Sequence, residues 1–263
     1  MSAFGELVSF CPALAAEAVL AEKVLHKDPV SALKKLSFTG GNILRCIMAF
    51  EGLAEPESET PLASLNLLSN RGFLPAMLVP FFHVVNAEIR SIAPGIAQMR
   101  APLVLRLALR LSVWFLKSYG DHAPSGLTTA KNIDDAIGII RDNLVSDSAK
   151  RAARKEANRR ASTMQLSEEE TRVIVDYQLR SVDWEADTLS LRFSQGARPE
   201  KGIYKAIAEW PTETGPADYA LFAGIDFIGF IEAKKMGKDV TVIYYAKARF
   251  FALPQDKGGP QFL

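Results

Sequence analysis

The sequence predicts an α+β protein in which a helical N-terminal domain precedes a small α/β domain. Apolar residues recur at helical spacing over residues 13–119, and a polar segment with Pro124 and Gly126 follows at 121–129. Short runs of strand-forming residues appear only beyond residue 187. With 263 residues, 48% of them apolar, the chain is long enough for a core in each domain.

Five helices are predicted in the first domain, several of them with recognisable end signals. Asp28 followed by Pro29 is typical of an N-cap and a first helical position, and Gly120 is typical of a helix end. The Gly40-Gly41 pair indicates a kink or a split in the second helix. The predicted ranges are 13–25, 29–50, 61–69, 74–92 and 98–119.

A basic helix is predicted between the two domains. Residues 147–160 hold six basic residues against two acidic ones. The candidate contacts to nucleic-acid phosphates are Lys150, Arg151, Arg154 and Lys155. The alternative is a connector helix whose charges only keep it solvated. We therefore expect a helical domain at 1–125, a helical connector at 126–165 and an α/β domain at 166–263, and we expect the last to be truncated.

The α/β domain begins with the pattern of a capping box. Ser167 precedes Glu170 by three residues, and the helix they start continues through Leu179. Runs typical of strands follow at 188–193, 217–223, 227–233 and 240–245. Gly224-Ile225-Asp226 separates the second and third runs, which predicts a hairpin with a three-residue loop.

The length of this loop determines which residues of the two strands face each other. A three-residue loop pairs Ala223 with Phe227, and the same register pairs Asp218 with Glu232. The Cβ atoms of this acidic pair would lie about 5 Å apart. Lys234 would project from the same face, because it follows Glu232 by two residues.

Two facing carboxylates beside a lysine are typical of a metal centre that hydrolyses phosphodiesters. Mg²⁺ or Mn²⁺ would relieve the repulsion between Asp218 and Glu232 and keep coordination positions for waters and phosphate oxygens. The Lys234 ammonium would position or help to deprotonate an attacking water. The alternative is an exposed hairpin edge with alternating charges. Apolar flanking residues favour buried strands instead, where unneutralised carboxylates are rare.

The hairpin resembles the nuclease core of the restriction (R) subunit of type I restriction enzymes, which has the PD-(D/E)xK fold. The similar segments are Ala217-Asp218-Tyr219-Ala220-Leu221-Phe222 and Ile231-Glu232-Ala233-Lys234. Residues 169–184 are similar to the first nuclease helix of that family, which implies that Glu170 is a further metal ligand. The helical first half is similar to the family's N-terminal region, mainly at 28–44, 82–83 and 105–114.

The resemblance implies Mg²⁺-dependent hydrolysis of double-stranded DNA in a complex with specificity and methyltransferase subunits. Asp218, Glu232 and Lys234 would be catalytic, and Glu170 would join the two carboxylates as a metal ligand. The chain contains no G-x-x-x-x-G-K-[ST] phosphate loop. We therefore expect that this chain does not bind ATP and lacks the ATP-driven motor that follows in such subunits.

Two alternative functions stay open. The family usually carries a glutamine and, four residues later, an aromatic residue on the helix after the hairpin, and residues 245–249 have neither at those places. This difference favours a truncated, non-catalytic fragment that binds partner subunits. The other alternative is a stand-alone PD-(D/E)xK nuclease with its own target.

Charge, cysteine content and hydropathy exclude several other classes of protein. The chain has 31 basic and 30 acidic residues, so its net charge of +1 generates no strong field that attracts nucleic acid or anionic membranes. Cys11 and Cys46 cannot form a disulfide framework or, with three histidines, a recognised zinc motif. We find no pattern of a secretory signal or a membrane span, and we expect a cytoplasmic protein.

Overall fold

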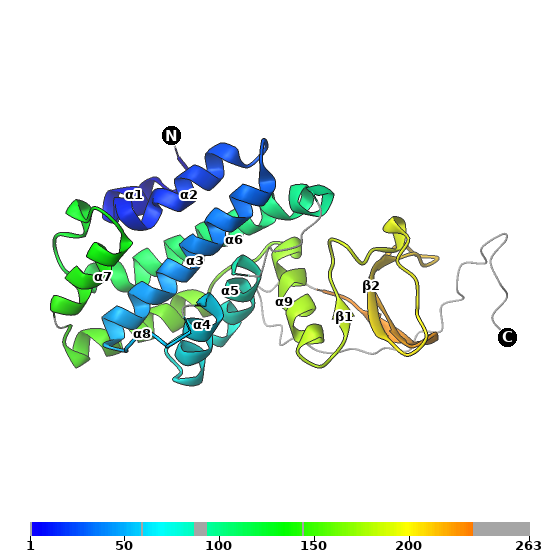
Figure 1. The fold of residues 1–263 in the computed structure, drawn as a ribbon. Coiled ribbons are helices and arrows are strands. Elements are labelled where there is room, and N and C mark those ends of the chain that lie inside the picture. Colours follow the sequence, from blue (N-terminus) through cyan, green and yellow to red (C-terminus); the bar gives the residue numbers. More distant parts are fainter. Residues whose placement is uncertain (1, 59, 87–93, 144, 234–263) are drawn as a thin grey trace. The chain divides into compact units, whose positions relative to one another are not determined.

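The computed structural model describes residues 2–58, 60–86, 94–143 and 145–233 (Figure 1). The helical first part and the four-stranded mixed sheet of the second part confirm the predicted α+β class. The chain divides into two compact units, residues 1–164 and residues 165–263, which are described separately. Within the described ranges, no helix is both long enough and apolar enough to cross a membrane.

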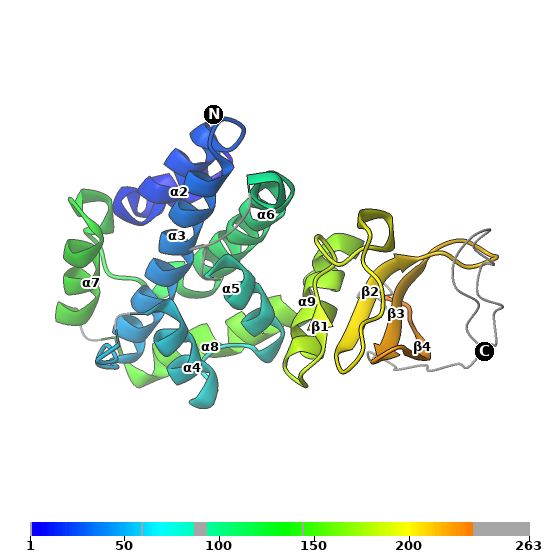
Figure 2. The ribbon, with the colours of Figure 1, turned by 45° about the vertical axis from the view of Figure 1, so that its right-hand side comes forward.

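Unit 1 is an assembly of α-helices built around two long ones (Figure 2). These two helices, α3 (Pro29–Glu51) and α6 (Pro94–Tyr119), pack against each other and bury their apolar faces. The other α-helices are α1 (Gly5–Phe10), α2 (Pro12–Val24), α4 (Pro61–Asn70), α5 (Val79–Val85), α7 (Ile133–Asp142) and α8 (Asp147–Ser162). Short 3-10 turns lie at Ala76–Leu78, Gly120–His122 and Leu127–Thr129.

The start of α3 follows the predicted signals, whereas its middle does not. The Asp28 side chain accepts a hydrogen bond from the Ser31 amide at 2.9 Å, and Pro29 is the first helical residue. The predicted split at the Gly40-Gly41 pair is wrong, because α3 continues through it. A Cβ atom at Gly40 would lie 2.8 Å from Val85 Cγ1, so this glycine lets α3 pack closely against the end of α5.

Residues 126–165, expected as a connector, contain α7 and α8, which both pack within unit 1. Ala153, Ala157 and Ala161 form a buried stripe along α8. The Trp114 indole on α6 donates its Nε1–H to the Ala157 carbonyl at 3.0 Å. Small side chains on α8 thus allow a close contact with α6, and the basic residues lie on the rest of the helix surface.

Unit 2 consists of one helix and a four-stranded sheet with the strand order β1-β2-β3-β4 (Figure 2). The elements are α9 (Glu168–Arg180), β1 (Glu185–Ala186), a 3-10 turn (Phe193–Gln195), β2 (Tyr204–Trp210), β3 (Ala217–Ala223) and β4 (Asp226–Ile231). β1 pairs with β2 in parallel, and the other pairs are antiparallel.

The sheet of unit 2 has an apolar cluster on each face. Val175 and Leu179 of α9 pack with Tyr219 and the small side chains of β2. Residues of opposite parity, including Ile207 and Phe222, form a second cluster on the other face, as the alternation of strand side chains requires. The strands are therefore covered on the α9 face and partly buried on the other.

The observed strands of unit 2 differ from the predicted ones. The predicted strand at 188–193 is wrong, because the Asp187 side chain accepts hydrogen bonds from the Leu189 and Ser190 amides and forms a turn there. β2 was not predicted, since its alanine, lysine and glutamate residues are weak strand formers. The predicted strand at 240–245 lies outside the described residues.

Candidate functional site

The β3–β4 hairpin has a shorter loop than predicted and a compensating bulge. Ala223 pairs with Asp226, so the predicted pairing with Phe227 is wrong and the loop has two residues. A bulge between Leu221 and Phe222 then shifts the register by one residue. Beyond the bulge, Tyr219 pairs with Ile231, which is the register expected from a three-residue loop.

The end of this ladder brings the two acidic residues of the hairpin to neighbouring positions. The last pair is Tyr219 with Ile231. Asp218 directly precedes Tyr219 on β3 and Glu232 directly follows Ile231, so the two come next to each other in the antiparallel register. The Asp218 carboxylate accepts a hydrogen bond from the Ala233 amide at 2.6 Å, which ties it to the chain directly after Glu232. Glu232 itself is exposed at the end of β4.

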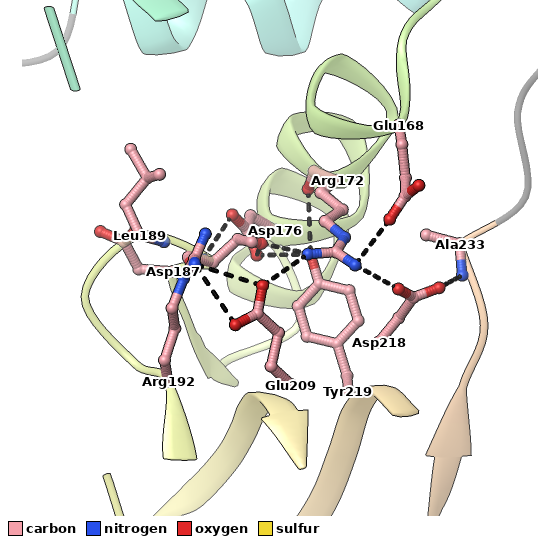
Figure 3. A network of polar contacts seen from close by, with 11 residues as sticks. Glu168, Arg172, Asp176, Asp187, Leu189, Arg192, Glu209, Asp218, Tyr219 and Ala233 are labelled. Carbon is pink, nitrogen blue, oxygen red and sulfur yellow. Dashed lines mark hydrogen bonds and ion pairs between the residues drawn. The ribbon is translucent and has the colours of Figure 1, made fainter. Parts of the chain in front are cut away.

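A single guanidinium group lies at the centre of a cluster of carboxylates in unit 2 (Figure 3). Arg172 of α9 contacts Asp218 at 2.5 Å, Glu168 at 2.7 Å and Glu209 at 3.3 Å. Only 13% of the Arg172 side chain and 13% of the Asp218 side chain are exposed. The carboxylates come from three different elements, α9, β2 and β3, and converge on one cation.

Glu209 is a member of this cluster that sequence reasoning missed. Its neighbours Ala208 and Trp210 pair with Tyr219 and Ala217, so Glu209 lies across from Asp218. Its φ of +53° is in the left-handed region, which non-glycine residues adopt at a cost in free energy. Without a prediction of β2, no sequence signal pointed to this residue. The strained backbone places a carboxylate next to Asp218, and such strain is concentrated at functional sites.

A second guanidinium supports the cluster from the side. Arg192 contacts the Glu209 carboxylate at 3.2 Å and donates to the Thr188 carbonyl at 2.5 Å. In Figure 3, Glu209 lies between the side chains of Arg192 and Arg172. Glu209 is thus shared by two cations, whereas Arg172 is the one cation that Asp218 contacts within the residues that the structure describes.

A buried hydrogen-bond network lies beside Asp218, on the face of the sheet that α9 covers. The Tyr219 hydroxyl lies 2.6 Å from the Thr188 hydroxyl and 3.0 Å from the Asp176 carboxylate. Burial raises the pKa of Asp176 from its ordinary value of 3.8 to about 6, although hydrogen bonds from Thr188 and Tyr219 lower it in part. The network joins α9 to β3 and thereby positions Arg172 over Asp218.

Glu170, expected as the third metal ligand, has a different contact in this structure. Its carboxylate accepts a hydrogen bond from the Ser167 amide at 2.7 Å and completes the predicted capping box. Among the described residues, no three His, Cys, Asp or Glu side chains are grouped so that they could hold a metal ion. The structure therefore does not join Glu170, Asp218 and Glu232 in one three-ligand site.

The remaining predicted site residues lie elsewhere. Lys234 lies outside the described residues. On α8, Lys150 donates to the Glu51 carbonyl at 3.2 Å, and Arg154 lies 3.6 Å from the Glu51 carboxylate. Arg151 and Lys155 are exposed on the surface of unit 1. Two of the four basic residues on α8 are thus engaged with Glu51, and two are accessible.

Comparison with known proteins finds a similarity in the sheet of unit 2. Residues 185–253 match the model of a family described as the second domain of the type I restriction enzyme EcoKI endonuclease subunit. This segment is therefore similar to that domain. It contains Glu209, Asp218 and Glu232 as well as Lys234, whereas α9 with Arg172 lies outside the matched range.

One curated relative supports the same identification. The type I restriction enzyme EcoKI endonuclease subunit of Escherichia coli (strain K12) is 56% identical over 84 residues. The matched segment covers 30% of this chain and 7% of that relative. No solved structure matches the chain. The comparisons therefore show that one segment of the chain is similar to a restriction endonuclease subunit, and that the match spans only a small part of that relative's length.

Proposed function

We propose that unit 2 is the nuclease part of a type I restriction endonuclease subunit and hydrolyses DNA phosphodiesters with Mg²⁺ or Mn²⁺. The observation that carries the proposal is the register of the hairpin, which brings Asp218 and Glu232 to adjacent positions within the segment that matches the family. Double-stranded DNA is the proposed substrate. Specificity and methyltransferase subunits are the proposed partners, and the cytoplasm is the proposed location.

The donor set at the end of the hairpin fits a hard divalent cation. Mg²⁺ needs only one or two carboxylates from a protein and fills its other positions with waters and phosphate oxygens. Asp218 and Glu232 supply two, and the carboxylate cluster already attracts a cationic group in the form of Arg172. A bound metal ion would activate water and stabilise charge on the phosphate.

Each residue of the proposed centre then has a defined role. Asp218 is held in place by the Ala233 amide, so one of its oxygens is oriented by the backbone. Glu232 is exposed to solvent directly after β4. Lys234 would lie on the same face of the chain, where its ammonium would position the attacking water and offset charge on the phosphate.

Glu170 is a proposed third ligand whose role can be separated from capping. Glu170→Gln keeps the capping box, because glutamine serves at this position as glutamate does, but it removes the negative charge. A ligand role predicts weaker metal binding in this variant. A role in capping alone predicts wild-type metal binding.

A plasmid-nicking assay tests the proposed nuclease. The full chain at high concentration should nick DNA weakly with Mg²⁺ or Mn²⁺, because no motor or specificity subunit delivers the substrate. Asp218→Asn and Lys234→Ala should abolish nicking, whereas Lys201→Ala, at an exposed turn of the same unit, should not. Equal nicking by wild type and Lys234→Ala would overturn the proposal.

One observation favours the alternative of a non-catalytic fragment that binds partner subunits. Both oxygens of the Asp218 carboxylate are engaged, one by Arg172 and the other by the Ala233 amide. A protein without metal chemistry would keep such an ion pair permanently. Absence of metal binding by the wild-type chain, combined with co-purification with specificity and methyltransferase subunits, would support this alternative. A stand-alone nuclease would instead cleave DNA and would not co-purify with such subunits.

A further inference from the structure

We infer that the Arg172 guanidinium occupies the cation position beside Asp218 in the metal-free protein and leaves it when a divalent metal binds. Arg172 would then be an internal competitor that sets the metal affinity of the site. The inference rests on the proposed function, because it requires that Asp218 is a metal ligand. It assigns to Arg172 a role in tuning metal affinity that the residues of the hairpin do not predict.

The first argument is the coordination of the guanidinium. Three carboxylates from three elements surround Arg172, with Nη2 contacting Asp218 and Glu168 and Nη1 contacting Glu209. Carboxylates that converge in this way repel one another unless a cation lies between them. The Arg172 guanidinium supplies that positive charge from the protein itself.

The second argument is that the guanidinium is not fully satisfied in this position. Arg172 Nε is buried and has no hydrogen-bond partner within the described part of the chain. A buried donor without a partner costs free energy. This cost opposes the buried position of Arg172, and displacement of the guanidinium toward solvent would relieve it.

The third argument is the net charge of the cluster. Among the described residues, the carboxylates of Glu168, Glu209 and Asp218 contact two guanidinium groups, those of Arg172 and Arg192. Within the described part of the chain, these three carboxylates and two guanidinium groups carry a net charge of −1. A divalent cation compensates this charge better than a monovalent side chain does.

The fourth argument is that Arg172 has a partner to which it can move. Glu168 lies one helical turn before Arg172 on α9, and 54% of its side chain is exposed. Arg172 can keep this i,i+4 pair while its guanidinium turns away from Asp218 toward solvent. Displacement would therefore not leave a buried charge without a counterion.

Metal titration of the full chain tests the inference. Binding of Mg²⁺ and Mn²⁺ is measured by calorimetry for wild type, Arg172→Gln, Arg172→Lys and Asp218→Asn. Removing a competitor must raise the apparent affinity, so Arg172→Gln should bind metal about tenfold more tightly, which corresponds to about 1.4 kcal/mol. The lysine of Arg172→Lys keeps the charge but reaches Asp218 less well. The metal affinity of this variant should therefore lie between those of wild type and Arg172→Gln.

Arg192→Gln is the matched control, because it removes a guanidinium from the same cluster without touching Asp218. Its metal affinity should change less than about threefold, because the charge that it removes does not contact Asp218 and acts on the metal only from a distance. An equal gain in both arginine variants would show a general charge effect and overturn the inference. Unchanged or weaker binding by Arg172→Gln would overturn it as well.

The same titration separates failure of this inference from failure of the proposed function. If wild type binds metal, Asp218→Asn does not, and Arg172→Gln behaves as wild type, only the role of Arg172 is refuted. If none of the proteins binds metal, the proposed nuclease centre fails and the inference fails with it. Circular dichroism checks that each variant is folded. If Arg172→Gln is unfolded, the comparison of Arg172→Lys with wild type tests the inference instead.

Discussion

Asp176 on α9 and Tyr219 on β3 share a hydrogen bond of 3.0 Å in the interior of unit 2. Tyr219 directly follows Asp218, and its hydroxyl also donates to the Arg172 carbonyl at 3.2 Å. The backbone of α9 is thereby joined to the strand that carries the candidate metal ligand. The distance between Arg172 and Asp218 depends on this buried link. Changes to Asp176 and to Tyr219 should therefore alter the stability of unit 2.

The stability of unit 2 should depend on the ionisation of Asp176. Its pKa is about 6 in the folded protein and 3.8 ordinarily, so between these values the folded protein holds a proton that the unfolded chain has released. Wild type should therefore lose stability from this group as the pH rises from 4 to 7. Asp176→Asn removes this loss. The free energy of unfolding of this variant should therefore rise by about 3 kcal/mol relative to that of wild type over this pH range.

Urea unfolding at several pH values between 4 and 7 measures this difference. Asp183→Asn is the control, because Asp183 is exposed and its φ of +64° suits asparagine as well as aspartate. The control should follow the wild-type pH profile. A constant difference between Asp176→Asn and wild type across the pH range would contradict the prediction.

Removing the Tyr219 hydroxyl should destabilise unit 2. Tyr219→Phe leaves Thr188, Asp176 and the Arg172 carbonyl without a shared partner, which should cost about 2 kcal/mol of unfolding free energy. Tyr204→Phe is the matched control on β2, since 55% of Tyr204 is exposed. It should change stability by less than about 0.5 kcal/mol. Similar losses in both variants, measured by urea unfolding, would refute a special role for the hydroxyl.

The left-handed backbone at Glu209 predicts an unusual order of stability. Glu209→Gly should be more stable than Glu209→Ala by about 1 kcal/mol, because only glycine adopts a φ of +53° without a steric cost. Both variants lose the same ion pairs, so their comparison isolates the backbone. At the neighbouring strand position the order should reverse, and Ala208→Gly should be destabilising by about 1 kcal/mol. Thermal unfolding of the three variants gives this order.

The turn of the hairpin should depend on Gly224. Its φ of +68° is required at the first position of the two-residue loop, so Gly224→Ala should cost about 1 kcal/mol. Contact is not the reason, because an added Cβ atom would meet its nearest neighbour at an ordinary 3.5 Å. Ile225→Ala, at an exposed site in the same loop, should have less than half this effect. Hydrogen exchange of the β3 and β4 amides reports both effects locally.

Local signals in the sequence were sufficient to predict several elements of the fold. The Asp28 N-cap and the capping box of Ser167 and Glu170 depend on residues three positions apart, and both form as predicted. Alternation and a glycine-containing loop were sufficient for the β3–β4 hairpin. The pairing of Tyr219 with Ile231 also follows the prediction, although the loop is one residue shorter, because the bulge at Leu221 restores the register.

The carboxylate cluster around Arg172 was decided by the tertiary structure alone. Glu209 belongs to a strand whose residues have weak strand propensity, and it reaches Asp218 only because β2 pairs with β3. Arg172 lies 46 residues before Asp218 and meets it because apolar contacts seat α9 on the sheet. Short-range hydrogen bonds can be predicted from neighbouring residues in a sequence. A cluster of charges from separate elements forms only when burial of apolar surface has brought these elements together.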